Sequence, residues 1–168
     1  MKNDVKNEMQ ITFDAISSNE SFARVAVAAF ASQLDPTVEE LDDVKTAVSE
    51  AVTNAIIHGY GNVAGCGKRG AIRHEEKEGR PGKVDVKCML ENGVLTVTVE
   101  DQGKGIADVA KAMEPLYTTR PDLDRSGMGF AFMEAFMDDL QVESTVGVGT
   151  IVRMKKKMTS GPWISAGE

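Results

Sequence analysis

Two alternating segments joined by an Asn-Gly turn constrain the fold of this chain more than any other feature. Asn92 and Gly93 tolerate the positive φ angles that a tight antiparallel hairpin requires. An antiparallel sheet with one apolar face must be covered by a second layer. Apolar side chains recur at every second position on both sides of the turn, as in strands with one buried face: Val84, Val86, Cys88 and Leu90 before it, and Leu95, Val97 and Val99 after it.

Asp101 has the same parity as the apolar residues of the second strand, so a carboxylate lies on the apolar face at the strand's end. Burying a carboxylate is costly unless a donor meets it. Gly103 and Gly105 follow at once, and glycines allow a backbone to approach a ligand closely. The segment therefore has two interpretations: Asp101 accepts from an exocyclic amine of a planar ligand, or it caps N–H groups of a turn.

The other periodic segments predict three helices and three more strands. Pro36 disfavours helix at the residue before it, so the first helix should end near Leu34. Thr37 can cap the second helix, which should end at Gly59. The order predicts an α+β fold, a two-layer sandwich with a mixed, mostly antiparallel sheet and helices on one face. The expected elements are a strand over 9–14, helices from about Ser18, from Thr37 and over 127–137, and a final hairpin of 140–144 and 150–154.

The length of 168 residues fits one domain, which we expect to span residues 1–155. Residues 61–82 are rich in glycine and charge, which predicts a flexible insert. A solvated loop is the simpler interpretation of this insert, and a regulatory segment is the alternative. Residues 156–168 are predicted to be a frayed tail.

Composition excludes several classes of protein. With 19 Lys and Arg against 26 Asp and Glu, the net charge is −7, which argues against direct binding to nucleic acid. The longest apolar run, Val25 to Ala31, is far too short for a membrane span, and the polar N-terminus does not have the pattern of a signal peptide. Cys66, His74 and Cys88 lack a fourth metal ligand, so two unrelated thiols in a reducing compartment are the preferred interpretation. We therefore expect a cytoplasmic protein.

Glu50 and Asn54 are four residues apart on the second helix, so they lie on one face. Their neighbours Ala51 and Ala55 are small and leave room for a ligand. A carboxylate and a carboxamide oxygen at this spacing can share a hard cation and its water. Taken alone, the pair is more typical of a solvated helix face.

Two more segments could bind phosphate. Gly127 and Gly129 open the third helix, where N–H groups and the helix dipole favour an anion, although glycine often only caps a helix. The chain has no Walker sequence, and the third glycine of the dinucleotide fingerprint is missing. The preceding loop carries Thr118, Thr119 and Arg125, which could close over phosphates or form ordinary surface salt bridges.

The order Glu50-x-x-x-Asn54, Asp101-x-Gly103-x-Gly105 and Gly127-x-Gly129 resembles the N, G1 and G2 boxes of the Bergerat-fold ATPases. That superfamily includes the gyrases, Hsp90, histidine kinases and MutL. Residues 19–24, 49–60, 115–121, 125–130 and 136–139 further resemble the anti-sigma factors of spore-forming bacteria, which are serine protein kinases. The resemblance covers roughly residues 8–155.

The resemblance implies that the chain binds ATP or ADP with Mg²⁺. Asn54 would ligate the metal, Glu50 would be the general base for a serine hydroxyl, and Arg125 would approach the γ-phosphate. Asp101 would bind the adenine amine. The other nucleotide-binding residues implied are Gly103, Gly105, Ile106, Thr118, Thr119, Ser126, Gly127, Met128 and Gly129.

The resemblance also implies partners. A homodimer would hold a sporulation sigma factor, sigma F, inactive when ATP is bound, and would phosphorylate a serine of an anti-anti-sigma factor. Arg24 matches a position on the family's partner-binding surface, although a purely structural arginine is the alternative. Two other functions remain open: an ATP-gated binding module without phosphoryl transfer, which would not need Glu50, and a general-stress anti-sigma kinase with a different sigma factor.

Overall fold

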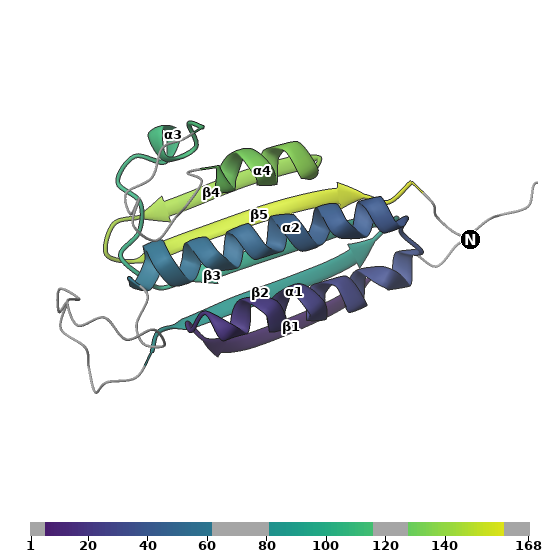
Figure 1. Ribbon diagram of the computed structural model, residues 1–168, viewed down its shortest axis with the longest axis horizontal. Helices are drawn as coiled ribbons and strands as arrows, with labels where there is room; N and C mark the ends of the chain where they lie inside the picture. The colour runs from purple at the N-terminus through teal and green to yellow at the C-terminus, as the bar shows by residue number, and fades with distance from the viewer. Residues whose placement is uncertain (1–5, 62–80, 116–127, 160–168) are drawn as a thin grey trace, which may run out of the picture.

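The computed structural model describes residues 6–61, 81–115 and 128–159, which form a two-layer α+β sandwich (Figure 1). Within these ranges, one antiparallel sheet has the strand order β1-β2-β3-β5-β4, and α1, α2 and α4 lie on one of its faces. The predicted fold class is therefore confirmed. The elements are β1 (Asn7–Asp14), α1 (Ser18–Ala31), η1 (Ser32–Leu34), α2 (Val38–Asn54), η2 (Ala55–Gly59), β2 (Lys83–Glu91), β3 (Val94–Asp101), α3 (Val109–Ala112), α4 (Gly129–Phe136), β4 (Asp139–Thr145) and β5 (Gly149–Lys157).

The hairpin of β2 and β3 forms as the sequence predicts. Asn92 and Gly93 have φ angles of 53° and 76°, both in the left-handed region that the turn requires. The strands pair antiparallel from Glu91 with Val94 to Val84 with Asp101. This register brings the alternating apolar side chains of both strands to the face that the helices cover.

The helices begin and end close to the predicted residues. Thr37 and Glu40 form a reciprocal capping box at the start of α2. The first helix is α-helical to Ala31 and ends in the short 3₁₀ turn η1, where Asp35 takes a left-handed conformation before Pro36. The helix that was predicted to reach Gly59 does so, but its last five residues widen into the π turn η2. The sequence did not predict α3.

The core lies between the helices and the sheet. Val44, Val48 and Val52 of α2 are fully buried, as are Val86 and Val97 of the sheet. The remaining buried positions of α1 and α2 are largely small alanines, which let these helices pack closely side by side. Because the apolar stripe of α2 faces the core, Glu50 and Asn54 lie on a neighbouring, partly exposed face of this helix.

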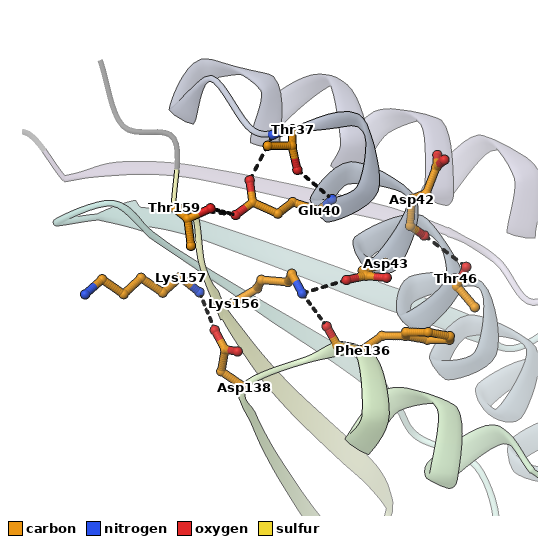
Figure 2. Close-up of polar contacts among 10 residues, drawn as sticks. All are labelled: Thr37, Glu40, Asp42, Asp43, Thr46, Phe136, Asp138, Lys156, Lys157 and Thr159. Carbon is orange, nitrogen blue, oxygen red and sulfur yellow. Dashed lines mark hydrogen bonds and ion pairs between the residues drawn. The ribbon is translucent and has the colours of Figure 1, made fainter. Parts of the chain in front are cut away.

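The last strand is longer than the sequence predicted. A strand ending at residue 154 was expected, but β5 continues to Lys157, and Met158 beyond it is buried. The sequence did not predict this extension because residues 155–157 are all lysines, which are typical of an exposed tail. The Lys156 stem turns inward, and its ammonium group donates to Asp43 of α2 and to the carbonyl of Phe136 at the end of α4, at 2.8 and 2.7 Å (Figure 2). The prediction of a frayed tail is therefore wrong for residues 156–157, which belong to β5, and residues 160–168 lie outside the described residues.

Most of the insert predicted at 61–82 also lies outside the described residues, since residues 62–80 are not among them. Cys66 and His74 fall in that range, whereas Cys88 is buried in β2, where burial raises the pKa of its thiol to about 12. No helix in the described ranges has the length and apolar character needed to cross a membrane.

Candidate functional site

A cavity of about 310 Å³ opens between the end of α2, the end of β3 and the start of α4. Five of the predicted site residues line it: Asn54, Asp101, Gly105, Ile106 and Gly129. These residues come from three distant parts of the chain, so the fold assembles the three motifs around one space. The rest of the lining is largely apolar, as is usual for small-molecule sites, and includes Ala51, Ala55, Val99, Ala107, Ala112, Phe130, Ala131 and Val152.

Asp101 is the buried carboxylate of the cavity, with 6% of its surface exposed. Its Oδ1 accepts a hydrogen bond from the N–H of Gly103 at 2.9 Å. Burial raises the pKa of Asp101 to about 6, against the opposing effect of hydrogen bonds from Gly103 and Thr150. A carboxylate offers about four lone-pair sites. Asp101 therefore caps the turn, as one interpretation predicts, and its carboxylate has lone pairs beyond those that Gly103 and Thr150 use.

Gly59 supports this carboxylate from the end of η2. A Cβ on Gly59 would lie 2.8 Å from Oδ1 of Asp101, so any larger residue there would require the carboxylate to shift. The carbonyl of Gly59 accepts from the N–H of Lys104 at 3.0 Å, and Gly103 packs directly against the Gly59 backbone. The Asp101–Gly105 loop is thereby held against the end of the helix that carries Asn54.

The same loop is tied to the hairpin of β4 and β5. The N–H of Ile106 donates to Oγ of Ser144 at 2.8 Å, and the carbonyl of Lys104 accepts from the N–H of Gly147 at 2.8 Å. Gly105, with φ of 73°, packs against the Thr145 backbone and adopts a conformation that favours glycine. This wall of the cavity is therefore preorganised by main-chain contacts.

Glu50 and Asn54 meet α4 at Gly129. A Cβ on Gly129 would lie 3.1 Å from Oε2 of Glu50 and 3.3 Å from both polar atoms of the Asn54 carboxamide. Glu50 therefore lies beside the cavity, next to Asn54, although it is not part of the lining. The helix-borne pair and the glycine that opens α4 form one group, and Met128 immediately precedes α4.

Not every predicted residue joins this group. Arg24 lies on α1, where its Nε is 3.8 Å from Oε1 of Glu20, and it does not line the cavity. Glu20 in turn accepts from the hydroxyl of Ser49, the neighbour of Glu50. Five predicted residues lie outside the described residues, so their positions stay predictions: Thr118, Thr119, Arg125, Ser126 and Gly127.

The sequence analysis missed several residues of the cavity. Thr150 is buried and lies directly across from Asp101 in the register of β3 and β5. It shares the parity of Val152 and Met154, so a polar residue on a buried strand face was the signal, as it was for Asp101. His58, Gly59, Lys104, Asp108 and Glu114 also line the cavity, and no periodicity distinguishes them.

Comparison with known proteins identifies the class. The family model described as "Histidine kinase-like ATPase domain" matches residues 16–66 and 70–156. Among solved structures, the RsbU and RsbW domains of Rv1364c from Mycobacterium tuberculosis superpose with a TM-score of 0.59 at 19% identity. That match covers 90% of this chain and 32% of the longer protein, and it supports the fold alone.

Curated relatives narrow the class further. The protein named "Anti-sigma F factor" from Clostridium acetobutylicum is 56% identical over 153 residues, which is 91% of this chain and 95% of the relative. Its namesake from Bacillus subtilis is 49% identical over 155 residues, 92% of this chain and 95% of the relative. The chain therefore belongs to the histidine kinase-like ATPase domain family, in the group whose curated members are named anti-sigma F factor. Membership of this family implies that the domain binds a nucleotide.

Proposed function

We propose that this protein is an ATP-dependent serine kinase and anti-sigma factor. In its ATP-bound state it binds a sporulation sigma factor of the sigma F type, and it phosphorylates a serine of the cognate anti-anti-sigma factor in the cytoplasm. The observation that carries the proposal is the convergence of Asp101, Asn54 and Gly129 on one cavity in a chain 56% identical to an anti-sigma F factor.

The adenine of ATP or ADP would bind at the Asp101 end of the cavity. Its exocyclic amine would donate to the carboxylate, whose remaining lone pairs suit such a donor. The flanking apolar lining, which includes Ile106 and Val99, suits the faces of a planar base. Gly103 and Gly105 keep this wall free of side chains, so that the backbone can approach the base.

The phosphates would extend toward Asn54 and the start of α4. The N–H groups near Met128 and Gly129 lie at a helix N-terminus, which favours negative charge. Asn54 would ligate Mg²⁺, which would supply charge neutralisation at the phosphates; its carboxamide oxygen is a ligand of the kind that this hard cation takes. Thr118, Thr119, Ser126 and Gly127 would complete the phosphate site, with Arg125 near the γ-phosphate.

Glu50 would act as the general base. Its carboxylate lies beside Gly129 and one helical turn before Asn54, next to the proposed phosphate position. It would take the proton of the serine hydroxyl as the oxygen bonds to the γ-phosphorus and the bond to the β-phosphate oxygen breaks. The products are phosphoserine and ADP. Phosphoryl transfer depends mainly on positioning and charge neutralisation, which this arrangement of residues supplies.

The partner proteins would dock through α1, on which Arg24 is 41% exposed and Phe22 and Val25 are exposed apolar neighbours. The active form would be a homodimer. Docking through α1 and the homodimer are both inferred from the resemblance to the anti-sigma factor group. Analytical ultracentrifugation with and without ATP tests the dimer.

The deciding experiment compares the chain with Glu50→Ala and with Glu134→Ala, an exposed carboxylate on α4 that serves as the matched control. Each protein is incubated with labelled Mg-ATP and the small anti-anti-sigma protein of the same genome. The proposal expects label on a serine with the chain and the control, and almost none with Glu50→Ala. Nucleotide binding without transfer by any of the three would instead favour an ATP-gated binding module.

A further inference from the structure

Tyr60 forms a hydroxyl bridge between the ends of two neighbouring strands. Its hydroxyl donates to the carbonyl of Lys83 at 2.6 Å and accepts from the N–H of Gln102 at 2.7 Å. Lys83 begins β2, and Gln102 follows the last residue of β3. Tyr60 itself follows η2, so one phenol joins the end of the helix to both strands.

The register shows what this bridge replaces. The last ladder pair of β2 and β3 is Val84 with Asp101, so the next pair in the same register would be Lys83 with Gln102. The Tyr60 hydroxyl lies between these two main-chain groups, where a direct hydrogen bond would otherwise continue the ladder. The hydroxyl therefore separates the ends of β2 and β3 immediately after Asp101. It also gives a hydrogen-bond partner to both main-chain groups that it separates, the Lys83 carbonyl and the Gln102 N–H.

Gly82 and the end of β1 accommodate the Tyr60 ring in this position. A Cβ on Gly82 would overlap the Tyr60 ring, so the glycine leaves the space that the ring occupies. The carbonyl of Gly82 accepts from the N–H of Ala15 at 2.8 Å, which holds it against the end of β1. Burial raises the pKa of the Tyr60 hydroxyl, which therefore stays protonated and able to donate at neutral pH.

We propose that Tyr60 is a positioning residue for adenine recognition, which acts through Asp101. By holding the end of β3 away from β2, its hydroxyl directs the Asp101–Gly105 loop over Gly59 and sets the orientation of the Asp101 carboxylate. In Tyr60→Phe, the N–H of Gln102 and the carbonyl of Lys83 lose their shared partner. The strand ends then either close on each other or take up water, and both changes move the residue next to Asp101.

This inference rests on the proposed nucleotide site, and its test separates the two. Binding of Mg-ATP and of Mg-purine riboside triphosphate, which lacks the 6-amino group, is measured by calorimetry for the chain and for Tyr60→Phe. The matched control is Thr12→Val. This variant removes a hydroxyl on β1 that donates to Asp85 on β2, and Thr12 does not line the cavity. In Tyr60→Phe the misplaced Asp101 carboxylate should make a weaker hydrogen bond to the adenine amine, which should weaken ATP binding about three- to tenfold.

The decisive quantity is the preference for ATP over the analogue. We expect Tyr60→Phe to reduce this preference and Thr12→Val to leave it unchanged. Only Tyr60→Phe changes the position of the Asp101 carboxylate, which is proposed to bind the 6-amino group. Unchanged affinities, or equal weakening of both nucleotides, would overturn the inference while leaving the nucleotide site intact. Failure of the unaltered chain to bind either nucleotide would overturn both proposals.

A second variant keeps the test decisive if Tyr60→Phe unfolds at the assay temperature, which circular dichroism reports. Gly82→Ala would displace the Tyr60 ring without removing its hydroxyl. It should reduce the ATP preference in the same direction. A preference equal to that of the unaltered chain would contradict the inference.

Discussion

Gly59 faces the Asp101 carboxylate so closely that a Cβ on Gly59 would lie 2.8 Å from Oδ1. Gly59→Ala should therefore rotate or displace the carboxylate and weaken ATP binding at least tenfold, as measured by calorimetry. Gly61→Ala is the control: Gly61 has a φ of 76°, and no atom of the described residues beyond its chain neighbours lies within 4 Å of its Cβ position, so backbone strain is the expected effect of this variant. We expect the control to lose stability but not affinity. Equal affinities of both variants would contradict the placement of adenine at Asp101.

The raised pKa of Asp101 predicts a pH dependence of stability. Its folded-state pKa is about 6 against an ordinary value of 3.8, so the folded protein binds the proton more tightly between these values. The contribution of Asp101 to stability should therefore decrease as pH rises from about 4 to about 6 and stay constant above. Asp101→Asn should remove this dependence. Urea unfolding of both proteins across this range measures it, and identical pH profiles would refute the assignment.

Nucleotide binding should have the opposite pH dependence. In the proposed site the adenine amine would donate to the ionised carboxylate, so affinity for ATP should increase as pH rises through about 6, where Asp101 loses its proton. Purine riboside triphosphate lacks that amine and carries the same phosphates, so it controls for their titration. The ratio of the two affinities should rise with pH in the unaltered chain and stay flat in Asp101→Asn.

Glu40 links the start of α2 to the end of the described chain. Its Oε2 accepts from the N–H of Thr37 at 2.9 Å, and its Oε1 accepts from the N–H and hydroxyl of Thr159 at 2.7 and 2.5 Å (Figure 2). Thr159→Val should lower the free energy of unfolding by about 1–2 kcal/mol, since it removes a hydrogen bond to a charged group. Thr46→Val, which removes a hydroxyl bond to the exposed carbonyl of Asp42, should cost less.

The same bonds predict an acid dependence. Hydrogen bonds from Thr159 and Thr37 hold the pKa of Glu40 at about 2, below its ordinary value of 4.5. Stability from Glu40 is therefore present above about pH 4.5 and is lost as pH falls toward 2. Glu40→Gln should show a shallower loss between these values in chemical unfolding. A loss as steep as that of the unaltered chain would contradict this assignment.

Local sequence patterns were enough to predict the strands of the sheet and to place Asp101, Glu50 and Asn54 at the ends of their elements. The parity of Val97, Val99 and Asp101 places a carboxylate on the buried face, and the Asn92-Gly93 turn fixes the register that brings Asp101 opposite Val84. Helical spacing likewise places Glu50 beside Asn54. These features depend on backbone periods that a sequence displays directly.

What the sequence could not predict depends on contacts between distant residues. The bridge from Tyr60 to Gln102 joins residues 42 positions apart, and nothing near Tyr60 in the sequence marks its hydroxyl as an acceptor for that amide. The extension of β5 was hidden because Lys156 is charged, yet its ammonium group finds Asp43, 113 positions away. Buried polar groups with long-range partners look like surface residues until the fold supplies the partner.

Gly129 provides the sharpest separation of stability from activity. A Cβ there would lie 3.1 Å from Oε2 of Glu50 and 3.3 Å from the Asn54 carboxamide, so both side chains must shift by a few tenths of an ångström. Gly129 is the first residue of α4 and does not have a positive φ, so alanine adds no backbone strain there and Gly129→Ala should fold about as well as the unaltered chain. Because phosphoryl transfer depends on positioning, the proposed serine kinase activity should fall at least tenfold in this variant. Thermal melting and single-turnover transfer measure the two effects, and an unchanged rate would exclude Glu50 and Asn54 from the reaction centre.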